Sequence, residues 1–139
     1  MLRRGDYVLC NFPFRGTRSP GPSPHIALRA ATGRLGSTSF AIVFYTTSQI
    51  AYEGARRPRQ YLLVDEARAQ ALGQRKPFHV DAGRIARLPV TADYFPRTER
   101  GEMHIFGHDP EFVARVEHRL EALLTAGLDV VKVDHASPR

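Results

Sequence analysis

The stretch between residues 13 and 24 limits the possible folds of this chain more than any other. It holds four prolines, two glycines and three hydroxyl residues, so neither a helix nor a central strand can run through it. Short apolar runs rich in strand-forming residues lie on both sides, at 7–12 and from residue 25 onward. We therefore predict two strands joined by a long surface loop.

A third apolar run, 40–45, ends at Thr47 and Ser48. Residues 32–39 are glycine-rich and predict the reversal between the second and third strands. These strands bring His25, Thr47 and Ser48 to strand ends. Further strand-like runs follow at 60–64, 77–82, 84–89 and 104–107. This strand-rich pattern predicts a mainly β fold, a small barrel of antiparallel strands.

Two helices are predicted from their end signals. Asp65 is expected to cap a short helix over 65–72, which Gly73 stops. Asp109 and Pro110 open a C-terminal amphipathic helix over about 109–126. We expect its apolar stripe to pack on the barrel rather than form a groove for a partner. A polar tail follows over 129–139, with a short strand at 130–133. The stripe consists of Phe112, Val113, Val116, Leu120, Leu123 and Leu124.

The length and composition are those of a single domain spanning 1–139. Hydrophobic residues make up 42% of the chain, but no apolar run is long enough to span a bilayer and no secretory signal is visible. We expect a cytoplasmic protein. Cys10 is the only cysteine, so an internal disulfide is excluded, and its place in an apolar strand predicts a core residue.

A formal net charge of +6 makes polyanions the natural partners to consider. Only two lysines are present, so arginine supplies nearly all of the positive charge. Guanidinium groups suit bidentate phosphate contacts and stacking on bases. Charge alone leaves open whether the chain binds nucleic acid, because many basic domains bind no specific anion.

Four short motifs occur in the order seen in one known family. They are Arg4-Gly5-Asp6, Asn11-Phe12-Pro13-Phe14, Pro24-His25-Ile26-Ala27-Leu28 and Thr47-Ser48-Gln49. This first third of the chain resembles the PemK/MazF-like toxins of bacterial toxin-antitoxin modules, and 84–89 shows a looser likeness. One departure matters: His25 stands where the family usually has an arginine.

The resemblance implies an SH3-like barrel, homodimerisation and a protein antitoxin as partner. It also implies a type II toxin with endoribonuclease activity on single-stranded RNA, without a cofactor. DNA binding is not expected. The alternative, from a different class, is a non-catalytic RNA-binding or regulatory barrel that has lost cleavage together with the arginine.

Metal-independent RNA cleavage uses the ribose 2′-hydroxyl as nucleophile, so the protein must supply a base, an acid and donors for the phosphate. His25 is the candidate base or acid, although a histidine there is also common as an ordinary strand-edge residue. Thr47 and Ser48 are candidate hydrogen-bond donors. The candidate RNA-binding residues are Arg15, Arg18, Arg29, Arg56, Arg57 and Arg59. Loop arginines are equally often merely solvated, and Arg29 is as well suited to point out of its strand.

Two other chemistries find no support in the sequence. His104 and His108 are four residues apart, but Gly107 and the Asp109-Pro110 cap place them before the helix, so they do not share a helical face. We therefore predict no metal site. A hydrolase triad is not expected either, because the nucleophile-elbow pattern is missing and Cys10 lies in mid-strand.

Overall fold

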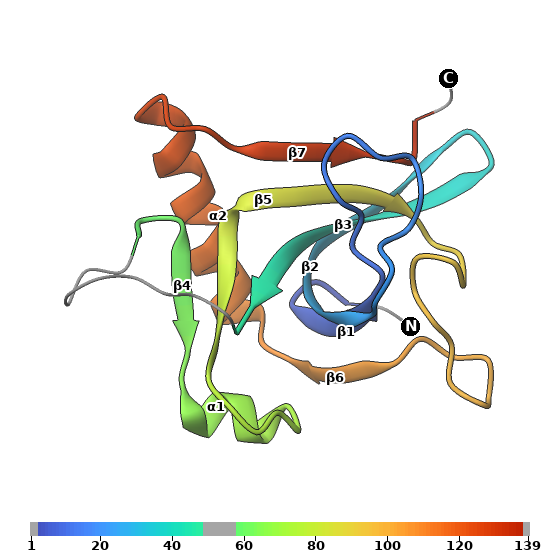
Figure 1. Cartoon of the computed structure of the whole chain (residues 1–139), viewed down its shortest axis with the longest axis horizontal. Coiled ribbons are helices and arrows are strands. Elements are labelled where there is room, and N and C mark those ends of the chain that lie inside the picture. Colours follow the sequence, from blue (N-terminus) through green and yellow to red (C-terminus); the bar gives the residue numbers. More distant parts are fainter. Residues whose placement is uncertain (1–2, 49–57, 138–139) are drawn as a thin grey trace.

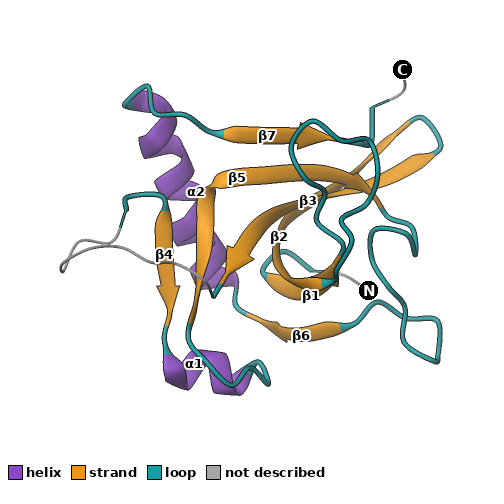
Figure 2. Ribbon diagram, viewed as in Figure 1, coloured by secondary structure: helices purple, strands orange, loops and turns teal. Residues whose placement is uncertain are grey.

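The computed structural model describes residues 3–48 and 58–137, and this part of the chain is a mainly β fold with two helices (Figures 1 and 2). One sheet holds all of its strands. The elements are β1 (Asp6–Cys10), β2 (His25–Leu35), β3 (Thr38–Thr47), β4 (Tyr61–Val64), α1 (Glu66–Ala71), β5 (Phe78–Pro89), β6 (Ile105–His108), α2 (Pro110–Thr125) and β7 (Val131–Asp134). The predicted mainly β class is thus confirmed. No helix in 3–48 or 58–137 has the length and apolar character needed to cross a membrane.

The main path of the sheet runs β4-β5-β3-β2-β1-β6, and each neighbouring pair is antiparallel. β7 lies off this path and pairs with β5 in parallel. Hydrogen bonding along the path makes an open sheet that ends at β4 and β6. β5 bends sharply midway (Figure 1). Its first half pairs with β4, and its second half pairs with β7.

The predicted glycine-rich reversal over 32–39 is wrong in extent. β2 continues to Leu35 and β3 begins at Thr38, so the turn is confined to Gly36 and Ser37, with Gly36 at a φ of 61°. Gly33 lies inside the strand, opposite Phe40. A Cβ there would come within 2.6 Å of the Phe40 ring, so this glycine serves close packing and not the turn.

The C-terminal helix α2 begins and ends close to its predicted bounds. Asp109 caps it, accepting a hydrogen bond from the Phe112 backbone N–H at 3.0 Å. Phe112 and Val116 are buried in the same apolar cluster as Phe44 of β3, which confirms that the stripe packs on the sheet. Leu124 is 46% exposed, so its assignment to the stripe is wrong. It follows Leu123 by one residue, which turns it about 100° away from the buried face.

The polar tail is held to the body of the protein as far as Ser137. Its predicted strand is confirmed as β7, shifted by one residue, and an ion pair between Arg87 and Asp134 fixes the pairing with β5. His135 then bridges two loops: its ring bonds the Tyr94 hydroxyl and the Thr17 backbone carbonyl, each at 2.8 Å. The tail thereby anchors the proline-rich loop.

Gly5→Ala is expected to lower the free energy of unfolding by about 2–3 kcal/mol. Gly5 has a φ of 93°, and a Cβ would lie 2.8 Å from the Pro110 Cα, against the rigid start of α2. Gly16→Ala is the matched control, because Gly16 has a similar φ of 81° but open space around it. Denaturant unfolding of both variants separates backbone strain from the clash. Equal losses would show that the contact with α2 is unimportant.

Candidate functional site

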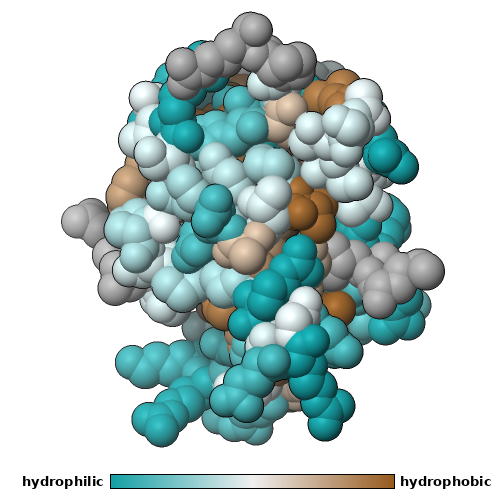
Figure 3. All heavy atoms as spheres, turned by 90° about the vertical axis from the view of Figure 1, so that its right-hand side faces the viewer, coloured by the Kyte–Doolittle hydropathy of each residue, from teal (hydrophilic) through white to brown (hydrophobic). Residues whose placement is uncertain are grey.

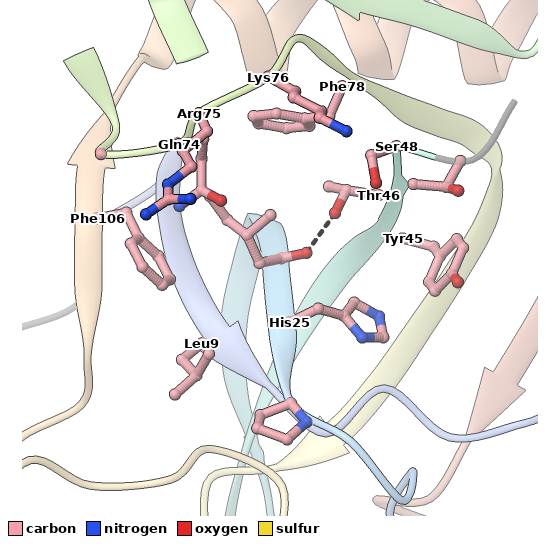
Figure 4. Close-up of a pocket in the computed structure, with 14 residues that line it drawn as sticks. Leu9, His25, Tyr45, Thr46, Ser48, Gln74, Arg75, Lys76, Phe78 and Phe106 are labelled. Carbon is pink, nitrogen blue, oxygen red and sulfur yellow. Dashed lines mark hydrogen bonds between the residues drawn. The ribbon is translucent and has the colours of Figure 1, made fainter. Parts of the chain in front are cut away.

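A pocket of about 770 Å³ opens where β2 begins and β3 ends (Figure 4). The three residues predicted to act in catalysis, His25, Thr47 and Ser48, all line it. They come from separate strands and meet because β2 and β3 are antiparallel neighbours. The opposite side of the pocket in Figure 4 is formed by the connection between α1 and β5.

The hydroxyl residues at the end of β3 become more exposed as the strand runs out. Thr46 is buried and donates a hydrogen bond to the Ile26 carbonyl, which ties the end of β3 to the start of β2 (Figure 4). Thr47 is half-buried and Ser48 is exposed. Thr46 therefore holds the pocket wall, while Ser48 presents its hydroxyl to solvent.

His25 is half-buried at the start of β2. Its ring meets the edge of Tyr45 at a centroid distance of 5.1 Å. Burial lowers the pKa of His25 below its ordinary value of 6.5, a hydrogen bond to the Ser23 backbone partly offsets this, and the Arg84 charge lowers it further. Nε2 is buried and has no hydrogen-bond partner. Nδ1 is therefore the ring nitrogen that hydrogen-bonds the Ser23 backbone. In the neutral ring, Nε2 then carries the free lone pair.

Sequence reasoning missed Arg84 as a member of this environment. Its guanidinium lies 4.1 Å from the centroid of the Tyr45 ring. A bulge in β5 places it there: Phe44 pairs with Ile85 and Tyr45 with Asp81, which leaves 82–84 unpaired with β3. Asp81 stabilises the bulge by accepting a hydrogen bond from the Gly83 N–H at 2.8 Å. The glycine between two strand-like runs was the available signal for a bulge.

Two further cations were missed, Arg75 and Lys76. Both are exposed and line the pocket from the connection after α1, on the other side from His25 (Figure 4). They bring positive charge to a pocket that already holds a neutral imidazole and hydroxyl donors. Nothing local in the sequence marks them, because the pairing of β5 with β3 and β4 sets their position.

Of the predicted RNA-binding arginines, the four that the structure describes do not line this pocket. Arg15 and Arg18 are exposed on the proline-rich loop, next to Phe14, which is 56% exposed. Arg59 is exposed beside β4. Arg29 is only 3% exposed and lines a different pocket. Arg56 and Arg57 lie outside the described residues.

The remaining histidines considered as metal ligands have other contacts. His108 Nδ1 lies 2.7 Å from an Asp6 carboxylate oxygen, and His104 stacks on Phe106 at a centroid distance of 4.4 Å. Within residues 3–48 and 58–137, no group of three or more histidine, cysteine or acidic side chains is placed to hold a metal ion. Cys10 is fully buried, as predicted, and burial raises the pKa of its thiol to about 12.

No protein-family model matches this chain, and a search of curated proteins finds no significant relative.

Proposed function

We propose that this chain is a PemK/MazF-like toxin that cleaves single-stranded RNA without a metal ion. One observation carries the proposal: the three residues selected by motif line one open pocket, in which His25 has a lowered pKa and an unpartnered Nε2. Groups with shifted pKa values in a cleft are typical of catalytic sites. A phosphodiester strand would also meet the cations Arg75 and Lys76 there.

In the proposed reaction, a rotation of the His25 side chain exposes its buried Nε2, which accepts the proton of a ribose 2′-hydroxyl, whose oxygen attacks the adjacent phosphorus. The bond from phosphorus to the 5′-oxygen breaks, and that leaving oxygen takes its proton from solvent water, because in-line attack places it on the side of the phosphorus opposite to His25. His25 then returns its proton to solvent. The products are a 2′,3′-cyclic phosphate and a 5′-hydroxyl end. Ser48 donates to a phosphate oxygen, and Arg75 and Lys76 stabilise the added negative charge of the transition state.

The family resemblance extends the proposal to the finer fold and the partners. The proposal includes an SH3-like barrel fold, a homodimer and a protein antitoxin as partner. An acidic segment of the antitoxin would cover the basic loop 13–24 and residues 56–59, of which 56 and 57 lie outside the described residues, because surfaces that attract RNA also attract acidic chains. Arg15 and Arg18 are exposed on that loop.

Incubation of the purified protein with a long single-stranded RNA tests the activity. We expect cleavage that persists in EDTA, with products ending in 2′,3′-cyclic phosphate, and no cleavage of an all-DNA strand of the same sequence, because DNA lacks the nucleophile. Activity that EDTA removes and magnesium or zinc restores would contradict the mechanism. RNA binding without cleavage would instead favour the non-catalytic barrel.

A further inference from the structure

A second pocket, of about 740 Å³, lies at the other end of the β2–β3 hairpin. It is an open pocket lined by residues between 29 and 39 of the hairpin and between 90 and 105, and it shares no lining residue with the first pocket. Figure 3 views the side of the molecule on which these loops lie, and most of that face is hydrophilic. Any ligand of this pocket would be separate from the RNA strand in the proposed active site.

Arg29 is the unusual residue of this pocket. It is 3% exposed, and its Nη2 hydrogen-bonds the hydroxyl of Thr32. Its Nε and Nη1 are both buried and have no hydrogen-bond partner. Buried guanidinium donors are almost always paired, because each donor left without an acceptor loses its hydration without compensation. The side chain therefore lacks acceptors in the protein alone.

Asp6 does not supply these acceptors. The negative charge of Asp6 acts to raise the pKa of Arg29. The Asp6 oxygens, however, bond His108 Nδ1 at 2.7 Å and the Arg3 backbone N–H at 2.6 Å. Gly5 is also engaged, donating to the Arg29 backbone carbonyl at 2.9 Å. Water or a bound anion is therefore left to accept hydrogen bonds from Nε and Nη1 of Arg29.

The charges around the pocket select an anion. Arg34 and Arg97 line it together with Arg29, against the single carboxylate of Glu102. Thr32 and Ser39 add hydroxyl donors. Several donors that surround one space from different sides suit a tetrahedral anion with many acceptor oxygens.

We propose that this second pocket binds a phosphate group, with Arg29 as its principal ligand. The group belongs to a nucleotide, either free or as part of a strand, because Val90, Met103 and Ile105 give the same pocket an apolar wall for the attached organic part. Its size is within the range of small-molecule sites. Arg29 lines this pocket, and binding would require its buried N–H groups to turn toward the phosphate oxygens.

The test is a titration of the ¹⁵N-labelled protein with inorganic phosphate, a 5′-mononucleotide and a short single-stranded oligonucleotide, followed by NMR. Saturable shifts of the Gly33 and Met103 amides report on the second pocket, and shifts of Gly73 report on the first. Arg29→Met is expected to weaken binding at the second pocket about tenfold or more. Arg97→Gln should weaken it by a smaller factor, and Glu102→Gln should strengthen it, because it removes the one negative charge.

Arg100→Gln is the matched control. Arg100 is an exposed arginine in the same connection but outside the pocket, so binding should change by less than about twofold. If Arg29→Met does not fold, the exposed Arg97→Gln and Glu102→Gln variants test the proposal instead, because their effects on binding should be opposite. Binding by the mononucleotide identifies a free nucleotide as ligand, and binding by the oligonucleotide alone identifies a strand. The absence of saturable shifts up to about 10 mM of every probe, or equal effects of Arg97→Gln and Arg100→Gln, would overturn the proposal.

Discussion

His25→Gln is expected to lower the rate of RNA cleavage by about 10²-fold or more, while RNA affinity changes by no more than about twofold. Proton transfer stabilises only the transition state, whereas binding depends mainly on contacts with phosphates. Glutamine keeps a polar side chain of similar reach at the start of β2, so the pocket should remain intact. Single-turnover cleavage measures the rate, and direct binding of an RNA with methylated 2′-oxygens, which cannot be cleaved, measures the affinity.

His118→Gln serves as the matched control, because His118 is exposed on α2 and does not line the pocket. It should leave both rate and affinity unchanged. His25→Arg introduces the arginine that is usual at this position in the PemK/MazF-like toxins, which the sequence resembles. It also replaces a titrating base by a permanent charge. Cleavage at the wild-type rate by His25→Gln would show that the histidine is structural.

The dependence of this rate on pH follows from the environment of His25. Burial first, and then the Arg84 charge, lower the pKa below 6.5, so the neutral base already predominates at neutral pH. The rate should therefore rise as pH increases through a value below 6.5 and then level off. Stability changes in the same direction: the unfolded chain binds the proton more readily, so folding is weakened as pH falls below about 6.5. Arg84→Gln should move the rate profile to higher pH, and an unmoved profile would exclude Arg84 from the environment of the base.

Local signals were sufficient for most of the fold. Asp65 and Asp109 cap the two helices as predicted, and the apolar runs became strands because their residues suit a half-buried pleated surface. The errors have local physical causes. Gly33 was read as part of a turn, but the strand needs a small residue beneath Phe40, and its sequence neighbours do not show this.

Local sequence signals were sufficient for some residues of the pocket and its surroundings but not for others. His25, Thr47 and Ser48 were identified because strand ends and motif order are visible in the sequence. Arg84 reaches its place through a bulge that depends on how β5 pairs with β3, so its role depends on tertiary structure. The opposite case is Arg29, which has the residue type expected for RNA binding but lies in another pocket. Residue type alone did not determine which arginines meet the histidine.

Replacement of both Arg75 and Lys76 by glutamine is expected to lower affinity for single-stranded RNA by about 10- to 100-fold at moderate salt. Both cations are exposed at the pocket, so their removal should not disturb the core. Each phosphate contact with a single strand contributes about 0.7 to the slope of log affinity against log salt, so the double variant should show a slope shallower by about 1.4. Filter binding or anisotropy over a series of salt concentrations measures both effects.

The control for this variant removes the same two charges elsewhere, as Arg100→Gln with Lys132→Gln. Both residues are exposed and neither lines the first pocket. If Arg75 and Lys76 contact phosphate directly, the control should keep most of its affinity and nearly the full salt slope, since charges beyond a Debye length of about 8–10 Å are largely screened. Equal losses in the two double variants would mean that RNA responds only to net charge. The pocket would then have to bind its strand through the hydroxyl and aromatic side chains beside His25.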